Sequence, residues 1–146
     1  MKVRDVMKSP VRTIERSGTI GDALQKMRNH AIRHLPVLDD QHLVGIISLR
    51  DLSNPGLPGR WHQTPWLSGT PVEWVMKSPV ITLSASAPLS EAASLMRGRR
   101  INCIPILEGD RLVGIITASD LLQLIEDRET ESWRPGLGRA VGALQR

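Results

Sequence analysis

The chain of 146 residues is long enough for one ordinary domain or for two small halves that share a core. Hydrophobic residues make up 40% of it and charged residues 23%, which is typical of a globular protein, and no apolar run reaches the roughly 18 residues that a membrane span needs. Phe and Tyr are absent and Trp occurs four times. The core must therefore be aliphatic, and few rings can stack on nucleic-acid bases.

The formal net charge of +4 arises in the first half of the chain. Residues 1–70 carry ten Lys and Arg against six Asp and Glu, whereas residues 71–146 carry nine of each. A basic surface can meet nucleic acid or a phosphorylated small molecule, but no block of five or six like charges indicates a nucleic-acid-binding tail. The N-terminal stretch lacks the apolar core of a signal peptide and Cys103 is the only cysteine. We therefore expect a cytoplasmic protein without a disulfide or membrane segment.

Residues 1–53 predict a mixed series of helices and strands. The stretch VRDVM (3–7) indicates a short helical entry that ends at the Ser-Pro step, because a residue before proline leaves the helical region. A brief extended segment at 13–14 precedes an amphipathic helix over 20–27. HLPVL (34–38) and LVGIIS (43–48) predict two strands joined by a polar loop of hairpin length. A final helix is expected immediately after the second strand.

The same order of elements recurs in residues 72–126. Aligning each residue with the one 69 positions later matches 3–52 to 72–121 without a gap, and 22 of the 50 positions are identical. VMKSPV and LVGII occur in both copies. Two copies are too few for a solenoid. The repeat therefore predicts an α+β fold in which tandem β-α-β-β-α motifs pack about a pseudo-twofold axis.

Two segments fall outside the repeated motifs. Residues 54–71 are rich in Pro and Gly and include Trp61 and Trp66, which predicts an ordered but irregular linker because two fully wet tryptophans are costly. Residues 127–146 contain further Pro and Gly breaks, and we expect them to form a mobile tail.

Each motif ends with a hydroxyl residue three places before an aspartate, as Ser48–Asp51 and Thr117–Asp120. One interpretation is a capping box, in which the two side chains satisfy free amides at a helix start. The other places the helix start at the mouth of a cleft, where the aspartate accepts hydrogen bonds from both hydroxyls of a ribose and the exposed amides favour a phosphate. The two interpretations are compatible, because one side chain can cap when the cleft is empty and bind when it is occupied.

The complete pattern resembles the CBS-domain pair, a tandem regulatory module also called a Bateman module. VMKSPV-x-T, the AL-x-x-M helix, the strand segments and GII[ST]-x-x-DL carry the resemblance, in order and twice, over residues 1 to about 126. The resemblance implies two small sheets with flanking helices, a pseudo-twofold pair of clefts and a homodimer. It also implies a regulatory ligand that contains adenosine (AMP, ADP, ATP or S-adenosylmethionine), with no further cofactor.

By position, the resemblance implies that each cleft joins the Ser/Thr-x-x-Asp end of one motif to the early segment and middle strand of the other. Cleft A would comprise Ile46, Ser48, Asp51, Val80, Ile81, Thr82, Ile101, Asn102, Cys103 and Pro105. Cleft B would comprise Ile115, Thr117, Asp120, Val11, Arg12, Thr13, Ile32, Arg33, His34, Pro36 and Arg50. Apolar members would sandwich the adenine, and backbone groups of the early segments would read its edge.

The two predicted clefts differ in charge. Cleft B gathers Arg12, Arg33, His34 and Arg50, where cleft A has Asn102, Cys103 and Ser119 at matching positions. Cations form charge-assisted bonds with phosphate. We therefore expect cleft B to prefer AMP, ADP or ATP, and cleft A to be weaker or to take a less anionic adenosyl ligand.

The other chemistry-bearing residues favour structural roles. His30 and His34 stand four apart, but the strand signal places His34 beyond the helix, so no metal site is expected. Cys103 on an apolar strand is typical of a small buried hydrophobe, and no histidine stands in local register to activate it. RGRR (97–100) falls at a helix end, where cations complement the dipole. Without a nucleophile–base pair, the sequence does not predict an enzyme.

The sequence therefore predicts a regulatory module that senses an adenosine-containing ligand and transmits its presence to an unknown partner protein. A ligand-free dimerisation or assembly module is the alternative, with both Ser/Thr-x-x-Asp motifs acting only as caps. A basic nucleic-acid binder is a third interpretation, which the scarcity of stacking residues disfavours.

Overall fold

The structure is a computed structural model that describes residues 1–52 and 69–132. Trp61, Trp66 and the linker up to residue 68 lie outside the described residues, as does the chain beyond residue 132. Within the described residues, no helix is both long enough and apolar enough to cross a bilayer.

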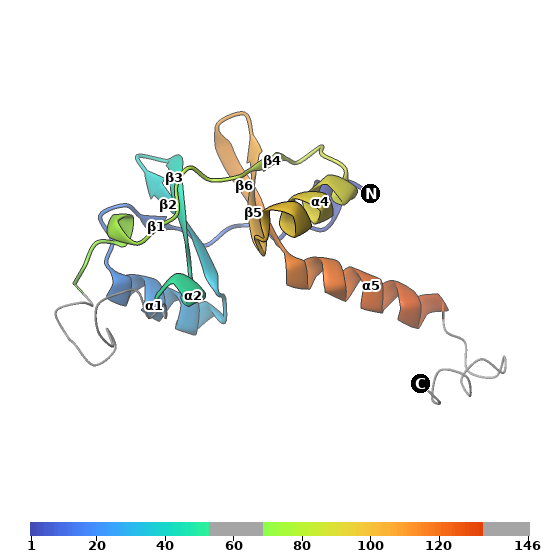
Figure 1. The fold of residues 1–146 in the computed structure, drawn as a ribbon, viewed down its shortest axis with the longest axis horizontal. Helices are drawn as coiled ribbons and strands as arrows, with labels where there is room; N and C mark the ends of the chain where they lie inside the picture. The colour runs from blue at the N-terminus through green and yellow to red at the C-terminus, as the bar shows by residue number, and fades with distance from the viewer. Residues whose placement is uncertain (53–68, 133–146) are drawn as a thin grey trace.

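Two three-stranded sheets of identical topology form the centre of the molecule (Figure 1). In the first, β1 (Ile14–Glu15) pairs in parallel with β2 (His34–Asp39), which pairs antiparallel with β3 (His42–Ser48). In the second, β4 (Leu83–Ser84), β5 (Cys103–Glu108) and β6 (Arg111–Thr117) repeat this arrangement. Both sheets carry the same register shift in the middle of the hairpin. The predicted α+β fold of duplicated β-α-β-β-α motifs is confirmed.

Tight turns close both hairpins where the sequence predicts polar loops. Asp40 and Gln41 have φ angles of 47° and 70°, and Gly109 has a φ of 59°. A two-residue turn with positive φ matches the right-handed twist of its flanking strands. The turns therefore fix the register that places Ser48 and Thr117 at the ends of their strands.

Each crossover helix buries a narrow aliphatic face against its sheet. Helix α1 (Ile20–His30) begins at a capping box between Thr19 and Asp22 and ends where Ala31 adopts the left-handed conformation. Helix α4 (Leu89–Arg99) follows Pro88, which has no N–H to leave unpaired. The side chains that these two helices bury are Ile20, Ala23 and Met27 in α1, and Ala92 and Met96 in α4.

The final helices of the two motifs are described over different numbers of residues. Helix α2 (Leu49–Leu52) is described for four residues, whereas α5 (Ala118–Ser132) continues for 15 and projects away from the sheets (Figure 1). Within α5, the Gln123 side chain donates to Asp127 and the Thr130 hydroxyl to the Glu126 carbonyl, and these contacts one turn apart support the distal half. Residues 127–132, which fall in the expected tail, thus belong to this helix.

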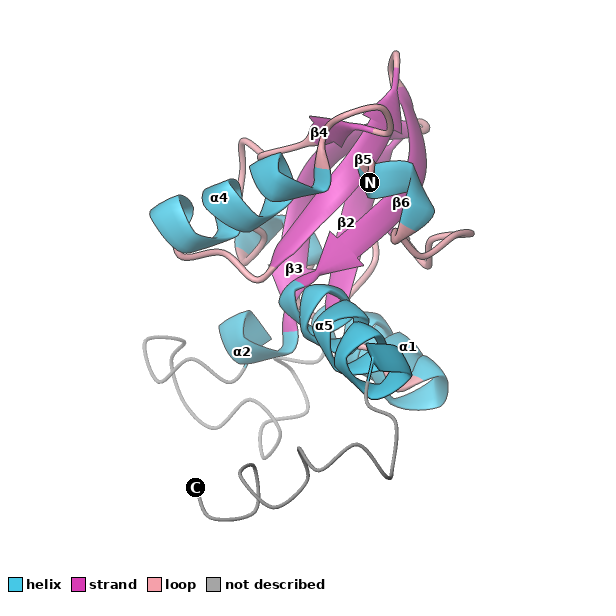
Figure 2. Ribbon diagram, turned by 90° about the vertical axis from the view of Figure 1, so that its right-hand side faces the viewer, coloured by secondary structure: helices cyan, strands magenta, loops and turns pink. Residues whose placement is uncertain are grey.

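The N-terminal segments of the two motifs are exchanged. Val3, in the 3₁₀ helix η1 (Val3–Asp5), is fully buried in the core of the second motif, while Val72, in η3 (Val72–Trp74), is buried in the core of the first. We call residues 14–52 with 70–76 lobe 1, and residues 83–132 with 1–7 lobe 2. The sequence repeats at 1–53 and 72–126 consequently do not coincide with the packed halves. Figure 2 shows the strands of both lobes stacked at the centre, with helices on either side.

A methionine packed on a glycine secures each exchanged segment. Met76 lies directly against the α-carbon face of Gly45 in β3, and Met7 lies in the same way against Gly114 in β6. A Cβ atom at either glycine would overlap the methionine Sδ and Cγ atoms. Glycine is therefore required by the close approach of the exchanged segment.

We expect Gly114→Ala to destabilise the protein by roughly 1–3 kcal/mol, because the added methyl group must displace Met7 from a packed interface. Gly98→Ala is the matched control: it lies in α4 with open space around its α-carbon, so alanine should stabilise the helix by about 0.5–1 kcal/mol. Equilibrium unfolding in urea measures both changes. A neutral or stabilising Gly114→Ala variant contradicts the proposed packing.

Truncating an exchanged valine should weaken the lobe that receives it. Val3→Ala leaves a small cavity in lobe 2 and is expected to raise amide hydrogen exchange in β5 and β6 more than in β2 and β3. Val72→Ala is the mirror-image control and should produce the reverse pattern. If Val3→Ala instead accelerates exchange first in lobe 1, the segment exchange is contradicted.

Candidate functional site

Both Ser/Thr-x-x-Asp motifs form capping boxes at the end of a hairpin. The Ser48 N–H donates to Asp51 Oδ2 at 3.0 Å, and the Asp51 N–H donates to Ser48 Oγ at 3.0 Å. In the second motif, the Thr117 N–H and hydroxyl donate to Asp120 Oδ2 at 2.8 and 3.0 Å, and the Asp120 N–H reaches Thr117 Oγ1 at 3.3 Å. The capping interpretation is confirmed, and it uses only one oxygen of each carboxylate.

The second oxygen of each carboxylate is paired with a lysine from the other sequence repeat. Lys8 Nζ lies 3.1 Å from Asp120 Oδ1, and Lys77 Nζ lies 3.2 Å from Asp51 Oδ1. Sequence reasoning missed both lysines. The signal was present, because Lys8 and Lys77 occupy the same position of the duplicated VMKSPV, 69 residues apart, as the two aspartates do.

Backbone hydrogen bonds deliver each lysine to its aspartate. Lys8 exchanges two bonds with Ile115 of β6, at 2.9 and 3.0 Å, and Lys77 exchanges two with Ile46 of β3, at 2.8 and 3.0 Å. Each lysine backbone is thus bonded to the strand residue that lies two positions before the capping hydroxyl. Placement of the ammonium groups follows from the segment exchange between the lobes.

The exposure of the two partners is very unequal. The Asp120 side chain is 8% exposed and that of Asp51 13%, whereas Lys8 and Lys77 are 72% and 74% exposed. A carboxylate with so little access to water needs donors around it, and these two have a cap on one oxygen and an ammonium on the other. Each aspartate carboxylate therefore accepts hydrogen bonds at the boundary between the lobes.

The apolar cleft residues of both strands lie on the sheet face opposite the lobe core. Leu35 and Ile47 point into the core of lobe 1, so the alternation of β-strands turns Pro36 and Ile46, which are paired in register, to the same face as Ser48. Pro105 and Ile115 take the equivalent places beside Thr117. The structure thus brings a partly exposed isoleucine together with each hydroxyl–aspartate pair, while Pro36 and Pro105 are fully buried.

His34 lies beside Asp51, although the sequence grouping put it in cleft B. It pairs with Ser48 across the β2–β3 ladder. Burial lowers the pKa of the imidazole, and the positive charges of Arg33 and Lys77 lower it further, against the opposing effect of the Asp51 carboxylate. The lowered pKa of His34 favours the neutral imidazole near pH 7. Its position does not support a charge difference that favours cleft B.

Cys103 occupies the position in β5 that matches His34 in β2. It pairs with Thr117, and burial raises the pKa of its thiol to about 12, with a further contribution from the negative charge of Asp120. A thiol with such a pKa stays protonated and unreactive near neutral pH. The structure therefore places Cys103 beside Asp120, whereas the sequence grouping put it in cleft A with Asp51.

Several other predicted site residues contribute through their backbone or pack elsewhere. The carbonyls of Arg33 and Asn102 accept hydrogen bonds from the first residues of α2 and α5, both at 2.8–2.9 Å, which fixes the helix starts. Ile32 and Ile101 pack against the cores of lobe 1 and lobe 2. The remaining members are Val11, Arg12 and Thr13, Val80, Ile81 and Thr82, which follow the two lysines in the connecting segments, and Arg50, which precedes Asp51 in α2.

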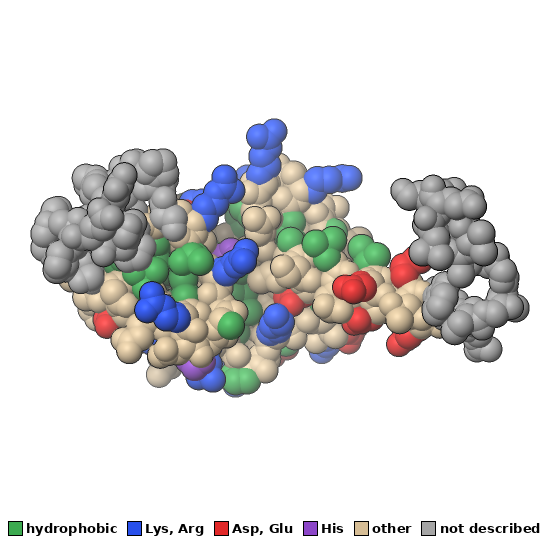
Figure 3. All heavy atoms as spheres, turned by 90° about the horizontal axis from the view of Figure 1, so that it is seen from below, with side chains coloured by type: hydrophobic (Ala, Val, Ile, Leu, Met, Phe, Trp, Pro, Cys, Tyr) green, Lys and Arg blue, Asp and Glu red, His purple; other side chains and the backbone are tan. Residues whose placement is uncertain are grey.

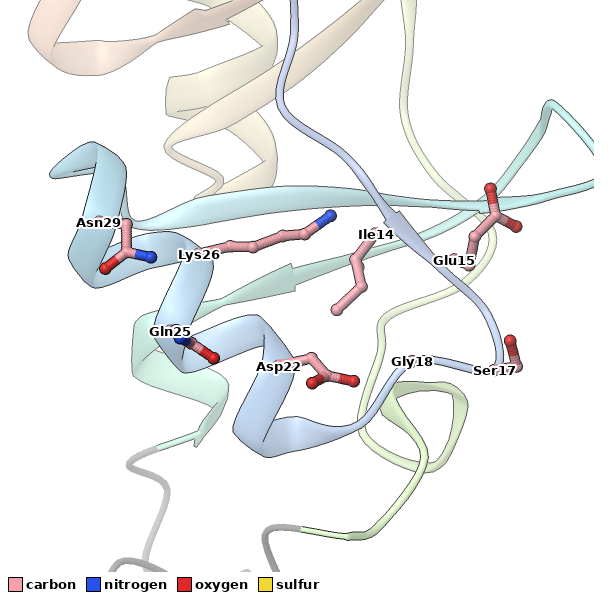
Figure 4. A pocket seen from close by; sticks show the side chains of 8 residues that line it. All are labelled: Ile14, Glu15, Ser17, Gly18, Asp22, Gln25, Lys26 and Asn29. Carbon is pink, nitrogen blue, oxygen red and sulfur yellow. The ribbon is translucent and has the colours of Figure 1, made fainter.

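A polar hollow of about 540 Å³ lies away from both aspartates, between β1 and α1 (Figure 4). Asp22, Lys26 and Asn29 of α1 line one side of it, and Ile14 and Glu15 line the other. Within it, Lys26 Nζ donates to the Thr13 carbonyl at 2.8 Å and Asp22 caps α1, so these two charged groups already have structural partners. In residues 1–52 and 69–132, no group of three or more His, Cys, Asp and Glu side chains could hold a metal ion.

The curated relatives of the chain fall into two kinds. It is 35% identical to a CBS domain-containing protein of Dictyostelium discoideum, over 84% of this chain and 90% of that one. It is 34% identical to a homoserine O-acetyltransferase of Methanosphaerula palustris over 84% of this chain, which spans only 24% of that enzyme. The similarity to the enzyme is thus confined to one part of it.

Solved structures extend the comparison to the fold. A protein from Vibrio cholerae described as a putative acetoin utilization protein is 33% identical, with a TM-score of 0.75 over 92% of this chain and 98% of that one. The CBS domain pair of protein MJ0100, solved in complex with 5′-methylthioadenosine and S-adenosyl-L-methionine, is 27% identical, with a TM-score of 0.74 over 88% of this chain and 98% of that one.

The family model described as CBS domain matches residues 3–54 and 72–127, which carry the two capping boxes and both exchanged segments. The chain therefore belongs to the CBS domain family and contains two consecutive copies of the domain.

Proposed function

We propose that this CBS-domain pair is a regulatory module that binds an adenosine-containing ligand at one or both of its inter-lobe aspartates. The observation that carries the proposal is the pair of nearly buried carboxylates, Asp51 and Asp120, each at the end of an apolar strand and each reached by a side chain of the other repeat. A carboxylate in such a place can accept hydrogen bonds from both hydroxyls of a ribose.

The adenosyl part of the proposal draws on two structural relatives. The domain pair of MJ0100 was solved with two adenosyl compounds. MJ1225 of Methanocaldococcus jannaschii, described as a putative archaeal homolog of g-AMPK, is 26% identical with a TM-score of 0.75, over 85% of this chain and 47% of that one. In this chain, the partly exposed Ile46 and its counterpart Ile115 supply apolar surface for a purine, above the fully buried Pro36 and Pro105.

Ligand binding at these aspartates would act through the geometry between the lobes. Each carboxylate pairs with a lysine delivered by the exchanged segment, so a ligand that takes the carboxylate changes a contact that spans the lobes. A ligand that favours one arrangement shifts the population toward it, and a partner protein that distinguishes the arrangements responds to the same free energy. On this account the protein is a cytoplasmic regulator and has no enzymatic activity of its own.

An assembly role is the second candidate, because α5 carries an exposed apolar stripe. Leu122 and Ile125, three residues apart on this projecting helix, are 67% and 59% exposed. Such a stripe is typical of a helix that packs against a partner, and the resemblance to CBS pairs favours a homodimer. Figure 3 shows acidic side chains along the same helix, which disfavours nucleic acid as the partner there.

Asp51→Asn and Asp120→Asn test the proposal through ligand-induced stabilisation. If AMP, ATP, S-adenosylmethionine or 5′-methylthioadenosine binds the native protein, its melting temperature must rise, by an amount equivalent to about 2.7 kcal/mol at a ligand concentration of 100 Kd. An amide donates one hydrogen bond where the carboxylate accepts, so at least one of the two variants should lose most of the rise. Differential scanning calorimetry with and without each ligand measures it.

Asp110→Asn provides the matched control, because this aspartate lies in the β5–β6 turn, away from both capping boxes. The control should retain the full rise in melting temperature. Absence of any rise in the native protein with all four ligands contradicts the sensor function. In that case, a concentration-dependent oligomer in sedimentation that is weakened by Leu122→Asp supports the assembly role instead.

A further inference from the structure

We infer that Lys8 and Lys77 are displaceable counter-ions that make the two clefts select a phosphorylated ligand over an uncharged or cationic adenosyl compound. The inference rests on the proposed function and names the residues that set its specificity. It starts from the ion pairs of these lysines with Asp120 and Asp51. The sequence motifs point to the two aspartates but not to the lysines.

In the structure, each lysine is paired with the carboxylate oxygen that a ribose needs. Oδ2 of Asp51 and Oδ2 of Asp120 are held by the cap, with donors at 2.8–3.0 Å. The Oδ1 atoms face the ammonium groups at 3.1–3.2 Å. A sugar diol that binds the carboxylate therefore competes with the lysine for Oδ1, and the ammonium group must move.

Displacement moves the ammonium group but leaves the lysine backbone in place. Lys8 is anchored to Ile115 and Lys77 to Ile46 by paired backbone hydrogen bonds. Each side chain is more than 70% exposed, so its head can swing through water without crossing packed atoms. The displaced cation consequently stays within a side-chain length of the bound sugar.

The charge left beside the sugar determines which ligand fits. An uncharged nucleoside satisfies the aspartate but leaves the lysine without a partner, and a sulfonium adds a second positive charge to the site. A phosphate on the ribose restores the lost pair through a charge-assisted hydrogen bond. Arg33 lies close enough to this site for its positive charge, like that of Lys77, to lower the pKa of His34. Near Asp51, this second cation adds to the preference for a phosphorylated ligand.

Salt provides a test that needs no variant. Increasing NaCl from about 0.05 to about 0.5 M weakens exposed ion pairs. Adenosine, which must break the Lys–Asp pair, should bind more tightly at high salt, whereas AMP, which gains a Lys–phosphate pair, should bind more weakly. Isothermal titration calorimetry measures both affinities. Salt dependences of the same sign for the two compounds overturn the inference.

The double variant Lys8→Met/Lys77→Met removes the cations and keeps the apolar stems. We expect the ratio of AMP affinity to adenosine affinity to fall roughly five- to tenfold, because AMP loses a partner and adenosine loses a competitor. The salt-induced rise in adenosine affinity should also disappear. Arg97→Met/Arg111→Met, on exposed positions of α4 and β6, lowers the net charge equally and should leave the ratio unchanged.

The outcomes separate this inference from the proposed function. If the native protein binds neither AMP nor adenosine, the proposed function fails for these compounds and the inference fails with it. If both bind and the affinity ratio is the same in the native protein and the lysine variant, the function stands and the lysine selectivity is overturned. Tighter binding of 5′-methylthioadenosine than of AMP by the native protein overturns it as well.

Discussion

The reciprocal exchange of residues 1–7 and 70–76 between the lobes is the constraint on which the rest of the structure depends. Val3 completes the core of lobe 2 and Val72 that of lobe 1, so each lobe is closed by residues that belong in sequence to the other repeat. The exchange requires a glycine in β3 and in β6, where a methionine covers the strand. Packing therefore fixes where the next residue of each segment, Lys8 or Lys77, meets the opposite sheet.

That position gives each carboxylate two simultaneous roles. One oxygen caps the helix that follows the hairpin, and the other receives a cation from across the lobe boundary. Because Asp51 and Asp120 are nearly buried, neither can lose a partner without gaining another. A ligand that replaces the lysine on Oδ1 would therefore leave the local cap on Oδ2 in place and change the contact between the lobes, which would link site occupancy to the arrangement of the module.

Features set by local chemistry could be predicted from the sequence. The strand–turn–strand pattern, the crossover helices and the Ser48 and Thr117 capping boxes depend on residues close in the chain, and the duplication showed them twice. Features set by contacts between the repeats could not be predicted in this way. An ungapped alignment treats VMKSPV as part of its own repeat, so it cannot show that Lys8 lies beside Asp120, and the residue types of His34 and Cys103 do not reveal which aspartate each one faces.

A crystal structure of the protein grown with AMP tests the central claim most directly. The account predicts ribose hydroxyls on Oδ1 of Asp51 or Asp120, the Oδ2 cap intact, and the matching lysine turned from the carboxylate toward the phosphate. A nucleotide bound elsewhere, with both Lys–Asp pairs kept at 3.1–3.2 Å, would contradict it.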